Sequence, residues 1–216
     1  MEGLESDEIK RLPLNRNIAG SEYSNILFRM GEYDAKNKLK VDSGENDFIF
    51  IDMKYNLGLM NEQAIENCLN SLHEKDSLNI LQTNYIKAKM NLISKDDIKK
   101  LIVVNPYTRG LKELMYAFLE KKPEKRIIFY KNALKYLKHI KYYYIEALYY
   151  YSLFLKENDS YDNYEETLNK GIELAKKYNY RFLSHNFYCL KNGVKKEYKL
   201  EDWYYVKLLD NTFSCL

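Results

Sequence analysis

Glycine, proline and cysteine are scarce in this sequence. Its 216 residues include 8 Gly, 3 Pro and 3 Cys. β-Sandwiches and barrels need many tight turns, and tight turns depend largely on Gly and Pro, so we expect helices instead. The three cysteines, Cys68, Cys189 and Cys215, are far apart and odd in number. They form no disulfide framework, which favours a reducing cytoplasm.

Long apolar runs and an excess of one charge are also missing. The longest apolar runs, such as residues 48–51, are far too short to span a bilayer. Residues 1–20 are polar, so we expect no signal peptide. The 34 basic and 31 acidic residues leave a net charge of +3, which does not indicate nucleic acid as a partner. We therefore expect a soluble cytoplasmic protein with no membrane partner.

Motifs for catalysis or metal binding are absent from the sequence. The three histidines are scattered, and there is no HExxH, GxSxG, GxGxxG or phosphate loop. His185 fits a hydrogen-bonded core position better than a ligand position. Asp96 and Asp97 lie near a predicted helix start, where they favour the helix dipole. Gly110 stands alone, and Gly193 is placed to stop a helix after Asn192. We expect no enzyme, no cofactor and no metal site.

What the sequence does contain is a helical repeat. Small and apolar residues recur at the packing positions of a tetratricopeptide repeat, with Gly171 at a position where two helices cross closely. Five units start near residues 48, 81, 111, 148 and 182, separated by 33, 30, 37 and 34 residues. The period of this repeat class is about 34 residues. The sequence thus predicts an all-α domain of stacked antiparallel helix pairs over residues 21–216, preceded by a loose arm over residues 1–20. An irregular helical bundle without a true repeat is the alternative.

Two residue clusters stand out within the repeats. Lys131, Lys135 and Lys138 share one helix face. This face is either a solvated surface or a docking surface for an acidic partner or a phosphate backbone. The tyrosines at 142–144 and 149–151 wrap most of a helix circumference. Some of these rings must face a neighbouring helix, a groove or a partner.

The segment 143–205 resembles the repeat region of peptide-sensing regulators of Firmicutes and their phages. The resemblance rests on residues 144–151, 169–176 and 186–192 and on the trailing Trp203, and it is nearest to the arbitrium receptors and their RRNPP-like relatives. It implies a tetratricopeptide-like right-handed superhelix, a concave groove for a short peptide and often a homodimer. Those quorum-sensing regulators control transcription through an N-terminal helix-turn-helix or sequester a partner protein. Residues 1–45 lack a convincing helix-turn-helix pattern.

Geometry nominates residues for the concave groove. In such a repeat, positions +1, +5 and +8 from each unit start face the concave side, and a residue two before a start could also point inward. The predicted ligand-binding residues are Gln82, Lys89, Arg109, Lys112, Tyr116, Tyr149, Leu153, Lys156 and Phe187. Aromatic and aliphatic walls with basic groups suit a peptide that carries carboxylates. Alternatively, the protein's own last helix, over residues 200–209, fills this groove.

Two functional hypotheses follow from the sequence. The first is a non-enzymatic peptide sensor or regulator that recognises a short peptide or protein segment. The second is a phage- or mobile-element-encoded inhibitor or adaptor that docks on a host protein without a small ligand. Lys131, Lys135 and Lys138 are the predicted partner contacts. Trp203 and Leu208 lie on an apolar C-terminal helix that either caps the repeat or pairs with its copy in a homodimer.

Overall fold

Every regular element of the described chain is an α-helix. The computed structural model describes residues 62–71, 77–158, 161–178 and 180–194. The helices in these ranges are α5 (Glu62–Ser71), α6 (Ser77–Lys89), α7 (Lys95–Lys100), α8 (Pro106–Leu119), α9 (Pro123–Leu137), α10 (Lys141–Glu157), α11 (Tyr161–Lys177) and α12 (Arg181–Asn192). The predicted all-α class is confirmed for this part of the chain.

Local sequence signals explain several of the helix ends. The Asn105 side chain accepts a hydrogen bond from the Thr108 N–H, and the Thr108 hydroxyl accepts one from the Asn105 N–H. This capping box, followed by Pro106, starts α8. Pro123 takes the first position of α9 in the same way. Gly193 has φ 65° and closes α12, as the sequence predicts.

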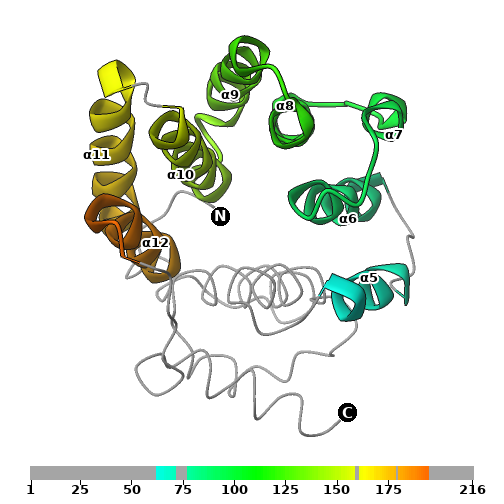
Figure 1. Cartoon of the computed structure of the whole chain (residues 1–216). Helices are drawn as coiled ribbons and strands as arrows, with labels where there is room; N and C mark the ends of the chain where they lie inside the picture. Colours follow the sequence, from blue (N-terminus) through cyan, green and yellow to red (C-terminus); the bar gives the residue numbers. More distant parts are fainter. Residues whose placement is uncertain (1–61, 72–76, 159–160, 179, 195–216) are drawn as a thin grey trace, which may run out of the picture.

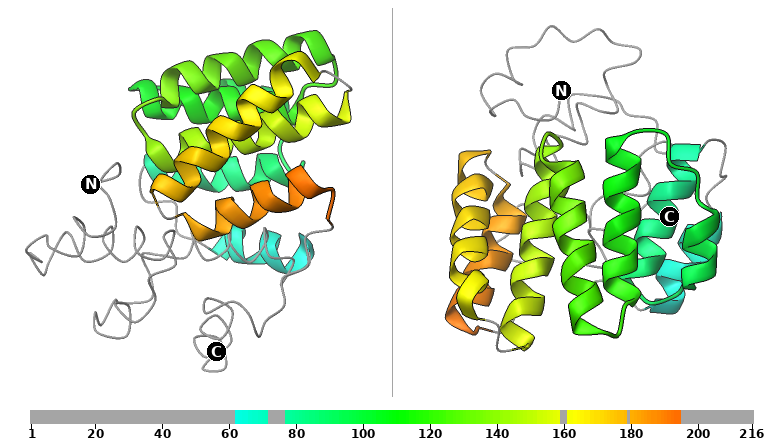
Figure 2. Two further views of the ribbon diagram at one scale, coloured as in Figure 1. Left: turned by 90° about the vertical axis from the view of Figure 1, so that its left-hand side faces the viewer. Right: turned by 90° about the horizontal axis from the view of Figure 1, so that it is seen from above.

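The helices from α6 to α12 form a curved row (Figure 1). α6, α8, α10 and α12 lie toward the inside of the curve, while α7, α9 and α11 lie toward the outside. From α8 onward, three-residue loops at 120–122, 138–140, 158–160 and 178–180 join successive helices. Loops this short turn each helix back beside the preceding one. Viewed from above, neighbouring helices lie side by side along the row (Figure 2).

The predicted unit starts coincide with helices wherever the structure describes them. Residues 81, 111, 148 and 182 lie in α6, α8, α10 and α12. These are the four helices on the inner side of the row (Figure 1). The unit start at 48, the arm over residues 1–20 and the last helix over residues 200–209 lie outside the described residues.

α10 is the central helix of the row and packs against α9, α11 and α12. Its tyrosines face these neighbours: the rings of Tyr142 and Tyr180 lie 5.4 Å apart, and those of Tyr151 and Tyr130 lie 5.3 Å apart. Because α10 is surrounded by other helices, it is apolar around most of its circumference. The wide tyrosine cluster is therefore explained largely by packing within the protein.

Two glycines allow helices to approach closely. A Cβ atom at Gly171 would clash with the ring of Phe187, so the predicted need for a small residue at this position is confirmed. A Cβ atom at Gly110 would clash with the Leu137 side chain. The sequence pattern does not assign Gly110 this role. Close crossings of this kind leave no room for a larger residue.

Glu120 ties the α8–α9 loop to α7. Its Oε1 accepts hydrogen bonds from the N–H groups of Lys121 and Lys122, and its Oε2 accepts one from Lys95 Nζ at 2.8 Å. The hydrogen bond from Lys95, followed by that from the Lys122 N–H, lowers the pKa of Glu120 from 4.5 to about 2. The contacts in the folded chain therefore stabilise the ionised form of the Glu120 carboxylate.

We expect Glu120→Gln to change how stability depends on pH. A carboxyl group whose pKa is lowered by folding stabilises the protein above its unfolded pKa and loses this effect as the pH falls. For Glu120 the loss runs from pH 4.5 down to about pH 2. Urea unfolding midpoints across this window should fall less steeply in Glu120→Gln than in the wild-type protein. Glu124→Gln, at an exposed position on α9, serves as the control, and equal slopes in the two variants would contradict the assignment.

Candidate functional site

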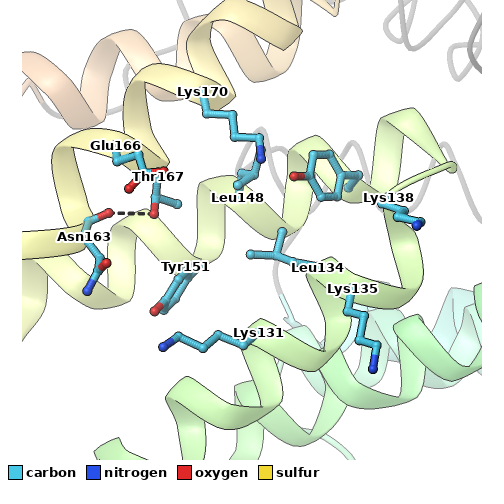
Figure 3. A pocket seen from close by; sticks show the side chains of 11 residues that line it. Lys131, Leu134, Lys135, Lys138, Leu148, Tyr151, Asn163, Glu166, Thr167 and Lys170 are labelled. Carbon is cyan, nitrogen blue, oxygen red and sulfur yellow. Dashed lines mark hydrogen bonds between the residues drawn. The ribbon is translucent and has the colours of Figure 1, made fainter.

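A groove lies between α9 and α11, with α10 as its floor. Its volume is about 460 Å³. Figure 3 shows side chains from all three helices around it. It forms because α9 and α11 both pack on α10, and the side chains between them leave a trough. A site of this size suits part of a peptide or a small ligand.

The α9 wall carries three lysines. Lys131, Lys135 and Lys138 line the groove and are exposed. Their spacing of four and three residues places them along one helix face. Leu134 lies on the same side and points between the two walls (Figure 3). The wall thus combines one apolar side chain with three positive charges.

The α11 wall is of mixed polarity. Asn163, Glu166, Thr167 and Lys170 line it. The Thr167 hydroxyl donates a 2.6 Å hydrogen bond to the Asn163 carbonyl oxygen, which turns this hydroxyl toward its own helix. Lys170 Nζ lies 5.5 Å from the ring centroid of Tyr144, which also lines the groove. This contact draws the fourth lysine toward the floor.

The floor is apolar and uncharged. Leu148 and Tyr151 of α10 lie at the bottom, with 2% and 4% of their surfaces exposed. Burial raises the pKa of the Tyr151 hydroxyl, so this group is neutral at ordinary pH. Its ring stacks on that of Tyr130. Because both side chains are almost fully buried, the apolar surface that a ligand would meet comes from the half-buried Leu134 and Tyr144, with charges along the edges.

The groove carries a net positive charge. Four lysines line it against one carboxylate, that of Glu166. Like charges around one hollow raise the local potential and favour an anionic ligand. The lining contains no histidine, cysteine or serine, so the usual nucleophile–base pairs are missing from it. The arrangement can bind a ligand, and it shows no group placed for covalent chemistry.

Lys89, predicted as a groove ligand, lies inside the helix row. Its Nζ is 2.6 Å from Glu146 Oε1, and the two side chains are only 1% and 2% exposed. The Tyr85 hydroxyl donates to Glu146 Oε2 at 2.7 Å. Gln82, about two turns before Lys89, is half-buried and its side-chain amide donates to the Tyr107 hydroxyl. These contacts join α6 to α10 and α8. Both predicted ligand-binding side chains are therefore engaged with other residues of the protein.

Four more predicted ligands lie where α10 meets α12. The rings of Tyr149 and Phe187 pack edge to face at 5.5 Å, and both side chains are buried. Burial raises the pKa of the Tyr149 hydroxyl, so it stays neutral. Leu153 packs against the core, and Lys156 Nζ donates to the Leu190 carbonyl oxygen at 2.6 Å. The structure brings these residues together as a packed contact rather than as an open groove.

Lys112 caps the end of α7. Its Nζ donates to the carbonyl oxygens of Lys99 and Leu101, at 3.0 and 2.8 Å. Lys99 lies in the last turn of α7 and Leu101 is its C-cap residue, and carbonyls at a helix C-terminus have no helical partner. Partial burial lowers the pKa of Lys112. This lysine is therefore placed by α7 and lies apart from Tyr149 and Phe187.

Arg109 and Tyr116, the remaining predicted ligands, face α9. The Arg109 guanidinium lies 4.8 Å from the ring centroid of Tyr136, and the Tyr116 ring stacks on that of Phe129 at 5.3 Å. Partial burial raises the pKa of Tyr116. The predicted set is thus divided between two faces of the row. Trp203 and Leu208, predicted as partner contacts, lie outside the described residues.

The sequence interpretation singled out one of the two helix faces that line this groove, as a solvated or docking surface rather than as part of a groove. Lys131, Lys135 and Lys138 were recognisable from their spacing. Asn163, Thr167 and Lys170 follow the same spacing on α11, and this signal would have identified them. Nothing local indicates that the two faces meet, because that depends on how both helices pack on α10.

Three further observations bear on the class of protein. Within the described residues, no group of three or more His, Cys, Asp or Glu side chains could hold a metal ion. No helix there is long and apolar enough to cross a membrane. In comparisons with protein-family models, curated proteins and solved structures, nothing matches this chain.

Proposed function

We propose that this protein is a non-enzymatic helical-repeat binding protein that recognises a short peptide or protein segment. The helix pairs are of the tetratricopeptide kind, and the protein acts in the cytoplasm as a peptide sensor or regulator. The observation that carries the proposal is the groove between α9 and α11, with its apolar floor and lysine-bearing edges. An apolar centre with charged edges matches an amphipathic peptide.

Two features of the fold support the repeat assignment. Antiparallel helices joined by three-residue loops recur from α8 to α12, as expected for stacked helix pairs. The small residue at Gly171 meets Phe187 of the following helix. In this arrangement the α9–α11 groove lies between two outer helices of the row (Figure 1). We therefore place the ligand on this side rather than among the buried residues of α10 and α12.

A display library of short peptides tests the proposal. We expect the full-length protein to select peptides that bind in the micromolar range, as measured by calorimetry. Thr167→Trp places a large ring at the edge of the groove and should weaken binding by about tenfold or more, because it fills space that the ligand needs. Glu165→Trp adds the same ring at an exposed α11 position that does not line the groove, and it should leave binding unchanged.

The controls make the outcome decisive. Thermal unfolding of both variants shows whether either substitution damages the fold. If the selected peptides bind Thr167→Trp as tightly as they bind the wild-type protein, the groove is not their binding site. A library that yields no binder would count against the proposed function itself.

One observation favours the second candidate function, docking on a host protein without a small ligand. The α7–α8 loop exposes three consecutive apolar side chains, Ile102, Val103 and Val104, at 68%, 38% and 72%. Exposed apolar side chains in a row are typical of contact surfaces between proteins. A pull-down that captures one stoichiometric host protein, unaffected by the selected peptides, would favour this function.

A further inference from the structure

We propose that the occupant of the α9–α11 groove is an acidic amphipathic helix of a partner protein. This inference rests on the proposed function, because it names the ligand class of the same groove. Three properties of the groove support it: its charge, the spacing of its lysines and its apolar floor.

Charge complementarity selects an acidic partner. Lys131, Lys135, Lys138 and Lys170 surround the groove, and Glu166 is the single carboxylate in its lining. The three α9 lysines are exposed, so their ammonium groups can turn toward a partner at little cost. A basic segment would meet four like charges and would be repelled.

The spacing of the α9 lysines matches a helix. At 1.5 Å per residue, Lys131 and Lys135 are about 6 Å apart along the axis, and Lys135 and Lys138 about 4.5 Å. Carboxylates at positions i, i+4 and i+7 of a neighbouring helix repeat with the same two distances. In an extended segment, side chains on one side repeat about every 6.6 Å. A third carboxylate of such a segment would therefore lie beyond the third lysine.

The apolar floor argues for a polypeptide. Leu134 and Tyr144 are the partly exposed apolar side chains of the groove, above the buried Leu148 and Tyr151, and an amphipathic helix can lay its apolar stripe on them. A phosphate backbone would gain from the lysines but would leave this floor uncovered. The lining also contains no arginine, the residue that grips phosphate with paired hydrogen bonds.

The two walls orient the acidic stripe. On α11, Glu166 offsets the charge of Lys170, whereas every charged residue of the α9 wall is a lysine. The partner's carboxylates therefore face α9, and Glu166 opposes their placement near α11. Removing this charge should strengthen binding, because it removes a repulsion within the groove.

Designed peptides test the inference. One peptide of about 14 residues, or roughly four helical turns, carries leucines along one stripe and glutamates at i, i+4 and i+7 beside it. A second replaces the glutamates by lysines, a third replaces them by glutamines, and a fourth has a central proline that breaks the helix. A single-stranded oligonucleotide serves as the anionic probe without an apolar helix face. Fluorescence anisotropy measures binding of each probe to the full-length protein.

Charge-reversal variants locate the contact. Lys131→Glu combined with Lys135→Glu should lower the affinity for the glutamate peptide by about tenfold or more, because attraction is lost and repulsion is added. Lys125→Glu combined with Lys176→Glu makes the same change in net charge at exposed positions outside the groove lining, and should change affinity less than about twofold. Glu166→Gln should strengthen binding by about twofold to threefold.

The outcomes separate this inference from the proposed function. Preference for the glutamate peptide, lost in the groove variant and kept in the control variant, supports it. If the glutamine or lysine peptide binds as tightly at a site blocked by Thr167→Trp, the inference is wrong and the proposed function stands. If the proline peptide binds as tightly as the glutamate peptide, the partner segment is not a helix. If the oligonucleotide displaces the glutamate peptide at equal concentration, the partner is not a polypeptide. If none of the designed peptides binds, the inference is wrong, and the peptide library decides the proposed function.

Discussion

Lys89→Met should lower the free energy of unfolding by about 3–5 kcal/mol, the usual cost of removing one partner of a buried ion pair. The substitution leaves the Glu146 carboxylate inside the protein without this counter-charge. The pair is 1% and 2% exposed, and it joins residues 57 positions apart in the chain. Its loss therefore weakens the connection between α6 and α10.

A double substitution distinguishes this charge effect from lost packing. In Lys89→Met combined with Glu146→Gln, neither side chain is charged, and the Gln oxygen can still accept the hydrogen bond from the Tyr85 hydroxyl. We expect the double variant to be more stable than Lys89→Met alone, because it also removes the buried negative charge that Lys89 balances. Urea unfolding of the full-length protein measures both values.

The Lys95–Glu120 pair provides the comparison. It has a similar separation of 2.8 Å, but the Lys95 side chain is 45% exposed. Water screens such a pair, so Lys95→Met should have a much smaller effect than Lys89→Met. Equal losses for the two lysine variants would contradict the role assigned to burial.

Gly171→Ala should lower the free energy of unfolding by about 2 kcal/mol, although alanine is the better helix former. Alanine in place of glycine gains about 1 kcal/mol within a helix. Against this gain, the added Cβ would clash with the ring of Phe187, which is 0% exposed and packs on Tyr149. Overpacking of a core typically costs about 1–3 kcal/mol, and we expect the upper end because the ring has no free space to enter.

Two further variants test the steric cause. Asn169→Ala, at an exposed position two residues before Gly171, changes helix propensity without the clash and should stabilise slightly. Phe187→Leu should destabilise the wild-type protein more than it destabilises Gly171→Ala, because the smaller side chain relieves the clash. Thermal unfolding of the wild-type protein, Gly171→Ala, Phe187→Leu and the variant with both substitutions gives the coupling free energy between the two positions. A Gly171→Ala protein more stable than the wild type would show that the crossing tolerates a larger residue.

Much of the helix pattern could be predicted because its signals are local. Asn105, Pro106 and Thr108 start α8 through contacts within four residues, and Gly193 ends α12 through its own backbone conformation. The helices containing residues 81, 111, 148 and 182 were predicted from apolar spacing alone. Such spacing reports which side of a helix is apolar, and this information is present in a short window of sequence.

The candidate site was only half predictable. The lysines of α9 were recognised on one helix face, while Lys170 and Glu166 of α11 were not associated with them. Position rules also placed Lys112 and Tyr116 on the same face as Tyr149, whereas the structure turns them toward α7 and α9. The direction in which each face of α8 points depends on how α8 packs against its neighbours, and no local pattern records it.

Local patterns in the sequence predict helices and several of their ends, which the described residues confirm, but they left open whether a neighbouring helix, a groove or a partner covers the tyrosines of α10. The packing of the helices sets which charged residues are buried and which are exposed. Nothing in the local sequence distinguishes Lys89 from Lys131, yet Lys89 is buried in an ion pair with Glu146 and Lys131 lines an open groove. The reason is physical: helix formation depends on residues within one or two turns. Burial depends on partners many residues away, which come together only when the helices pack.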